Sequence, residues 1–176
     1  MKTRSVGKQA TILKTSSRDQ RGARSSKEPA VVAKGPAYAD PTACECCGAF
    51  FTKRTWRRDH PVTHALLIKA EWAKCPACRQ KRSGTAYGRV SLRGAFEGTA
   101  AAALRRRIIN VGKRAEYTQP QHRVMSVTRM EDGLEVLTTS QKLAHRIVHE
   151  LKKAFGGRAA YRWSAADGYL EAIWRQ

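Results

Sequence analysis

Two pairs of cysteines have the spacing of metal ligands: Cys44 with Cys47, and Cys75 with Cys78. Thiolates separated by two residues can reach one ion from the same tight turn, and two such pairs complete the tetrahedral shell of a structural zinc site. Gly48 follows the first pair and suits the turn, because glycine tolerates positive φ and lets backbone amides point at sulfur. We expect these four cysteines to hold one structural zinc ion.

Three further residues could enter the ligand set. Cys46 is a fifth thiol, and His60 and His64 are four residues apart on one face of a possible helix. Adjacent cysteines such as Cys46 and Cys47 are poorly disposed to chelate one ion, and the basic surroundings of the histidines favour a solvated face. We therefore favour the two cysteine pairs. Because a complete shell of four cysteines leaves no position for water, we expect no catalysis at this metal.

Charge is the second strong feature of the chain. Lys and Arg number 34 against 14 Asp and Glu, which gives a formal net charge of +20 and a pI near 10.5. Solubility is served by a charge of about 2–8, so an excess this large predicts a polyanionic partner. Residues 41–120 alone carry 16 basic and five acidic side chains. We expect RNA or the ribosome as partner, with no small-molecule substrate.

Location is predicted from what the sequence lacks. No stretch approaches the roughly 18 apolar residues of a membrane span, so we expect no membrane partner. The first thirty residues contain no apolar core of a secretory signal. A cytoplasmic protein is the expectation, because reduced thiols there favour metal over disulfides. An Arg- and Ser-rich, acid-poor start is also typical of an organelle transit peptide.

Residues 1–40 and 41–90 differ in composition. The first segment combines Ser, Lys, Arg, Gly and Pro without periodicity and is predicted to be a disordered basic arm along nucleic acid, or else a flexible solubilising leader. The second is predicted to be a small zinc-ribbon or treble-clef-like module, with a strand near Phe50 and a short helix over residues 61–68. Fifty residues bury little apolar surface, so the metal supplies folding free energy, about 10–16 kcal/mol for structural zinc.

The zinc module interleaves cations with an aromatic side chain. Lys and Arg neutralise phosphates, and an exposed Trp stacks on an unpaired base for about 1–3 kcal/mol. The residues expected to contact nucleic acid here are Lys53, Arg54, Trp56, Arg57, Arg58, Arg79, Lys81 and Arg82. Trp56 and Trp72 could instead pack in a core, and for Trp72 we favour that interpretation.

Residues 91–120 are predicted to connect the zinc module to a second domain. The expected elements are a strand over residues 88–96 and a helix over residues 100–117. Apolar residues recur at spacings of three and four along that helix, as in an amphipathic helix docked on its own domain. A membrane surface or a calmodulin-like partner are alternatives for such a basic helix. Its predicted nucleic-acid contacts are Arg105, Arg106, Arg107, Lys113 and Arg114.

Residues 121–176 predict a β-β-α-β-β domain, which makes the expected fold class α+β. Strands over residues 124–130 and 134–138 are joined through Asp132-Gly133, a strong hairpin signal. Thr139 or Ser140 caps a helix that runs to Phe155, and strands over 158–163 and 169–174 follow.

The cysteine knuckle and the segment from Asp132 to Ser140, running into Lys142–Val148, resemble the family of large-ribosomal-subunit export adaptors first named for nonsense-mediated decay. The resemblance covers about residues 44–78 and 124–163 and implies a factor that docks on the large subunit, with Cys44, Cys47, Cys75 and Cys78 as zinc ligands. The family usually has more cysteine pairs, a longer middle region and, in eukaryotes, an export signal in a C-terminal tail. We therefore expect a compact prokaryotic-type relative.

The sequence thus predicts a zinc-containing RNA-binding protein that associates with the ribosome in assembly, quality control or dormancy. The alternative is a zinc-ribbon DNA-binding transcriptional regulator, although no helix-turn-helix or multi-finger pattern is present. A zinc enzyme would need an open metal position, and a redox switch would use Cys46 as an attacking thiol. No triad, phosphate loop, dinucleotide fingerprint or carboxylate pair occurs, so we expect no enzyme.

Overall fold

The computed structural model describes residues 37–58, 61–164 and 168–176. These residues form four helices and nine strands, and the strands make up two separate sheets. The α+β class predicted from the sequence is therefore confirmed. The predicted basic arm, residues 1–40, lies outside the described residues except for its last four.

A four-stranded sheet and two short helices make up the cysteine-bearing part of the chain. Its strands have the order β3-β2-β1-β4, in which β1 pairs antiparallel with β2 and parallel with β4. The elements are β1 (Thr42–Cys44), β2 (Phe50–Thr52), β3 (Thr55–Arg57), α1 (His64–Lys69), β4 (Glu71–Ala73) and α2 (Pro76–Ser83). The short helix expected over residues 61–68 is α1, and it begins after Thr63, whose side chain accepts a hydrogen bond from the Leu66 amide.

The second sheet has five strands in the order β6-β7-β5-β9-β8. They are β5 (Gly88–Arg93), β6 (Val124–Met130), β7 (Gly133–Thr138), β8 (Arg158–Ser164) and β9 (Tyr169–Arg175). The central strand β5 pairs antiparallel with β7 and parallel with β9, while β6–β7 and β8–β9 are antiparallel hairpins. Both pairs of strands lie where the sequence predicts them.

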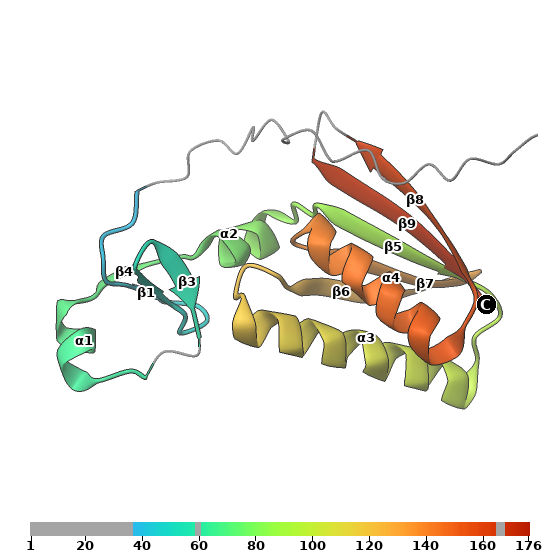
Figure 1. The fold of residues 1–176 in the computed structure, drawn as a ribbon, viewed down its shortest axis with the longest axis horizontal. Coiled ribbons are helices and arrows are strands. Elements are labelled where there is room, and N and C mark those ends of the chain that lie inside the picture. Colours follow the sequence, from blue (N-terminus) through green and yellow to red (C-terminus); the bar gives the residue numbers. More distant parts are fainter. Residues whose placement is uncertain (1–36, 59–60, 165–167) are drawn as a thin grey trace, which may run out of the picture. The chain divides into compact units, whose positions relative to one another are not determined.

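Two helices, α3 (Gly98–Thr118) and α4 (Gln141–Phe155), cover the same face of this sheet (Figure 1). Leu104 and Ile108 of α3 and Ile147 and Leu151 of α4 are buried in one core with the alternating apolar residues of the strands. Ser140 is the N-cap of α4 and accepts a hydrogen bond from the Leu143 amide, as one of the two predicted caps should.

The predicted role of residues 91–120 as a connector requires a correction. Strand β5 begins at Gly88, inside the predicted zinc module, and lies at the centre of the five-stranded sheet. Helix α3 contributes to the core of that sheet alongside α4. The β-β-α-β-β elements are present, but they form one layer structure with β5 and α3. Alternating apolar and polar residues indicate that a segment is a strand. Which strands lie beside it in the sheet depends on long-range pairing that a short pattern does not encode.

None of the helices in the described part of the chain combines the length and apolar character needed to cross a membrane.

Candidate metal centre

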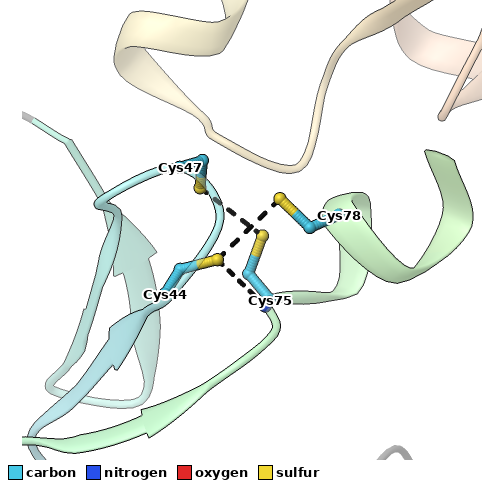
Figure 2. A group of neighbouring side chains, drawn as sticks. All are labelled: Cys44, Cys47, Cys75 and Cys78. Atoms are coloured by element: carbon cyan, nitrogen blue, oxygen red, sulfur yellow. Dashed lines mark hydrogen bonds between the residues drawn. The ribbon is translucent and has the colours of Figure 1, made fainter. Parts of the chain in front are cut away.

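The four predicted cysteines converge on one point. The sulfurs of Cys44, Cys47, Cys75 and Cys78 all lie within 4.8 Å of one another. Figure 2 shows one pair arriving from the end of β1 and the turn after it, and the other from the start of α2. These side chains could hold a metal ion, as the spacing of the two pairs predicted.

The first pair is held by a tight turn between β1 and β2. The Cys44 amide donates to the Ala49 carbonyl at 2.7 Å, and the Gly48 amide donates to the Cys44 carbonyl at 2.9 Å. Gly48 has φ +67°, a conformation that favours glycine, so the residue after the second thiol is suited to close the turn. The result is a knuckle in which Cys44 and Cys47 face the same side.

The second pair occupies the beginning of a helix. Cys75 is the N-cap of α2, Pro76 is its first residue, and Cys78 lies in its first turn. The positive end of the helix dipole and free amides at this terminus favour negative charge, which suits thiolates. The Cys75 amide donates to the Cys44 sulfur at 3.3 Å, so backbone from one pair contacts a thiol of the other.

The sulfur separations exclude disulfides among these cysteines. Both Cys44–Cys78 and Cys47–Cys75 have sulfur–sulfur distances of 3.8 Å, and all five cysteines of the chain are free. A disulfide would bring two sulfurs to about 2.05 Å. Cys44, Cys75 and Cys78 are buried and Cys47 is half-buried, so the cluster is enclosed on most sides.

An arginine from outside the cysteine-bearing segment contacts the cluster. The Arg123 guanidinium donates to the Cys47 sulfur at 3.0 Å and to the Cys78 sulfur at 3.4 Å. Arg123 is 5 % exposed and immediately precedes β6 of the five-stranded sheet. A buried cation is costly unless it is paired, so the charge of Arg123 matches the negative charge of thiolates.

Further contacts fix Arg123 in place. Its Nε donates to the Pro120 carbonyl at 2.7 Å and lies 3.6 Å from a carboxylate oxygen of Glu116. Glu116 also forms a 3.0 Å ion pair with Arg58, which in turn donates to the Cys47 carbonyl at 2.7 Å. A connected set of charged groups therefore joins the knuckle, the end of α3 and the start of β6.

Hydrogen bonds and burial shift the pKa values of the cysteine thiols in opposite directions. The hydrogen bond with Cys75 lowers the pKa of Cys47 to about 3 against the effect of burial, with Arg123 acting in the same direction. Burial raises the pKa of Cys78 to about 11. Burial lowers the pKa of Arg123, but its hydrogen bond to Cys47 and the charge of that thiolate outweigh burial and raise it above the usual value. The contact with Arg123 therefore favours the thiolate form of Cys47.

The other candidate ligands do not join the cluster. Among the described residues the metal-ligand group contains only the four predicted cysteines; Cys46 is exposed and His64 lies exposed on α1. His60 falls outside the described residues. The structure thus brings the two predicted pairs together and leaves Cys46 and His64 outside the group that could hold a metal.

Trp56 was predicted as a stacking residue, and its placement corrects that prediction. Its side chain is 7 % exposed and packs against Tyr38 and Phe51, with ring centroids 4.9 and 5.5 Å away. Trp72, predicted as a core residue, is 61 % exposed. Alternation along β3 would have placed Trp56 opposite the neighbouring exposed Thr55 and Arg57, a signal that the run of cations obscured.

Four of the predicted nucleic-acid contacts have partners within the fold. Arg58 pairs with Glu116, Arg107 pairs with Glu150 at 2.6 Å, and Arg79 donates to the Tyr38 hydroxyl at 2.6 Å. Arg105 is exposed but donates to the Val127 carbonyl at 3.1 Å. The other predicted cations are exposed, namely Lys53, Arg54, Arg57, Lys81, Arg82, Arg106, Lys113 and Arg114.

Comparison of the chain with models of known protein families and with curated proteins finds no match. The structural observations that bear on function are the metal centre and the charge of the surface.

Proposed function

We propose that this protein is a zinc-containing RNA-binding protein that associates with the ribosome through its large subunit. The observation that carries the proposal is a surplus of unpaired cations. The described residues include 25 Lys and Arg against ten Asp and Glu, and six of those ten acids are already in ion pairs. A surface that keeps this much positive charge after internal pairing favours a phosphate backbone as partner.

We propose zinc as the metal of this site. A tetrahedron with Zn–S bonds of about 2.3 Å has edges of about 3.8 Å, and two sulfur pairs in the cluster have that separation, 3.8 Å. Four soft thiolates select zinc or iron over magnesium and calcium. The shell would be complete with protein ligands, so the proposal gives the metal a structural role and assigns the protein no enzymatic activity.

The metal would stabilise the position of the sheet relative to the module. With four thiolates on a divalent ion the site carries two negative charges, and Arg123 offsets part of that charge from the sheet side. Loss of the ion would leave thiolates and a buried cation without the group that orders them. We therefore propose that RNA binding requires the metal.

The resemblance to the large-subunit export adaptors motivates the choice of the ribosome among RNA partners, as a compact prokaryotic-type relative in the cytoplasm. Assembly, quality control and dormancy are the three roles that such a factor would serve.

Crosslinking in cells followed by sequencing of the attached nucleic acid tests the proposal directly. We expect reads concentrated on large-subunit rRNA. Enrichment of specific DNA sites would instead support a transcriptional regulator, and reads spread over mRNA without rRNA would contradict ribosome association.

The cobalt-substituted protein should give a tetrathiolate spectrum; a spectrum with nitrogen or oxygen ligands would contradict the structural site.

A further inference from the structure

A groove of about 460 Å³ lies where the end of α3 meets α4. Its lining consists of Lys113, Arg114, Tyr117 and Thr118 from α3 and Arg146 from α4. Three of these five residues are cations, one is aromatic, one carries a hydroxyl, and none is acidic. A hollow of this volume is within the range of small-molecule sites, about 300–1,000 Å³.

The three cations of the groove have no acidic partner within the two helices that carry them. Glu116 is the acidic residue of α3, and it pairs with Arg58 and Arg123. Glu150 is the acidic residue of α4, and it pairs with Arg107. Each carboxylate that could neutralise the groove from these helices is thus committed to another arginine.

The cations near the groove also affect the histidine His122. Burial lowers the pKa of His122, and the charges of Lys142 and Arg146 lower it further. Lys142 and Arg146 thus lie close enough to His122 to disfavour a further positive charge there. A site with this potential favours an anion.

Tyr117 adds a surface for a base. Its side chain is 63 % exposed although it borders the groove. An exposed ring beside cations is the arrangement by which proteins bind single strands, because every base has a face that can stack.

We propose that this groove binds one nucleotide of single-stranded RNA, with its phosphate among the three cations and its base stacked on Tyr117. The inference rests on the proposed RNA-binding function and locates part of it. A strand is favoured over a free nucleotide because exposed cations continue along α3: Arg106 lies seven residues before Lys113. Seven residues are two helical turns, about 10 Å, so both side chains are on one face.

The test uses the full-length metal-loaded protein and a fluorescently labelled RNA of twelve uridines, with binding followed by anisotropy. Removing two of the three cations around this one phosphate in the double variant Arg114→Gln, Arg146→Gln should weaken binding roughly 5-fold at 0.1 M salt and flatten the salt slope by about 0.7. The matched control Lys152→Gln, Lys153→Gln changes the net charge equally on exposed residues of α4 outside the groove. It should bind nearly as tightly as the wild type.

Stacking is tested separately from charge. Tyr117→Ala should weaken binding about 5- to 150-fold, whereas Tyr117→Phe should retain the wild-type affinity because the ring remains. An RNA with abasic sites should lose most of the difference between these two variants. Metal content and the circular dichroism spectrum confirm the fold of each variant.

The outcomes separate the two proposals. Groove variants that bind as tightly as the control, while the wild type binds RNA, would overturn the groove and leave the proposed function standing. A wild type that binds no RNA would overturn both. Displacement of the RNA by uridine monophosphate at a concentration near the RNA dissociation constant would show a free-nucleotide site and overturn the strand assignment.

Discussion

Arg123 and Cys47 are 76 residues apart in the chain, and the Arg123 guanidinium lies 3.0 Å from the Cys47 sulfur. This contact joins the start of β6 to the knuckle between β1 and β2. The same guanidinium reaches the Cys78 sulfur, so one buried cation contacts both cysteine pairs. The metal centre is therefore completed by a residue of the five-stranded sheet.

The first prediction concerns this contact. Arg123→Met should weaken metal binding about 10- to 100-fold, the usual cost of losing a group that hydrogen-bonds metal ligands. Competition with a chromophoric chelator measures the affinity. Arg93→Met is the control, because Arg93 is an exposed arginine of β5 that pairs with Asp132 away from the cysteines. Equal affinities for both variants would show that Arg123 does not support the metal.

The second prediction concerns the ligands. Cys78→Ser should abolish stoichiometric metal binding and unfold the cysteine-bearing segment, because a small module depends on its metal for folding free energy. Cys46→Ser should keep one metal ion per chain, since Cys46 is exposed and outside the cluster. Elemental analysis and tryptophan fluorescence provide the two readouts. Metal loss in Cys46→Ser would contradict the ligand set.

The third prediction concerns the packing of α4 on β5. A Cβ added to Gly88 would lie 2.5 Å from Thr138 Oγ1 and 2.6 Å from Ala144 Cβ, both buried. Gly88→Ala should lower the free energy of unfolding by about 1–3 kcal/mol, measured by urea denaturation. Ser91→Ala, on the opposite face of β5, should change it by less than about 0.5 kcal/mol. Similar values for the two would mean that α4 shifts freely to accommodate the methyl group.

Local features of the structure were predictable from the sequence, and long-range features were not. The cysteine pairs, both hairpins and the α4 cap depend on residues close together in the chain, so their spacing predicts them. The central position of β5 depends on pairing with β9, about 80 residues later. Arg123 looked like any other basic residue, because only the folded chain brings it to the sulfurs.

The exposure of the aromatic residues was also not predictable from nearby sequence. Trp56 and Trp72 differ in exposure in the sense opposite to the one expected. The basic residues around Trp56 do not indicate which face of the three-residue strand β3 is turned toward the core. Tyr117 was not predicted as a binding residue either, although its position after Lys113 and Arg114 on an amphipathic helix would have placed it on the polar face.

The fourth prediction concerns pH. Burial lowers the pKa of His122, whose Nδ1 contacts the Ser140 hydroxyl at the start of α4. The folded state then binds fewer protons than the unfolded state at pH values between the lowered pKa and about 6.5, so stability falls as pH falls through that window. His122→Asn should show a smaller loss of stability between pH 7.5 and 5.5, on the order of the linkage for one proton. Urea midpoints that decline in parallel for both proteins would contradict this assignment.

The central claim is that a metal-ordered, cationic protein binds the large ribosomal subunit through phosphates. Co-sedimentation of the full-length protein with purified large subunits over a salt series measures this most directly. The account predicts binding at low salt whose logarithm falls with the logarithm of salt with a slope near −4 for about six single-strand phosphate contacts, and loss of binding after chelation. Protein that remains in the ribosome-free fraction at low salt, or that binds equally well without its metal, would contradict it.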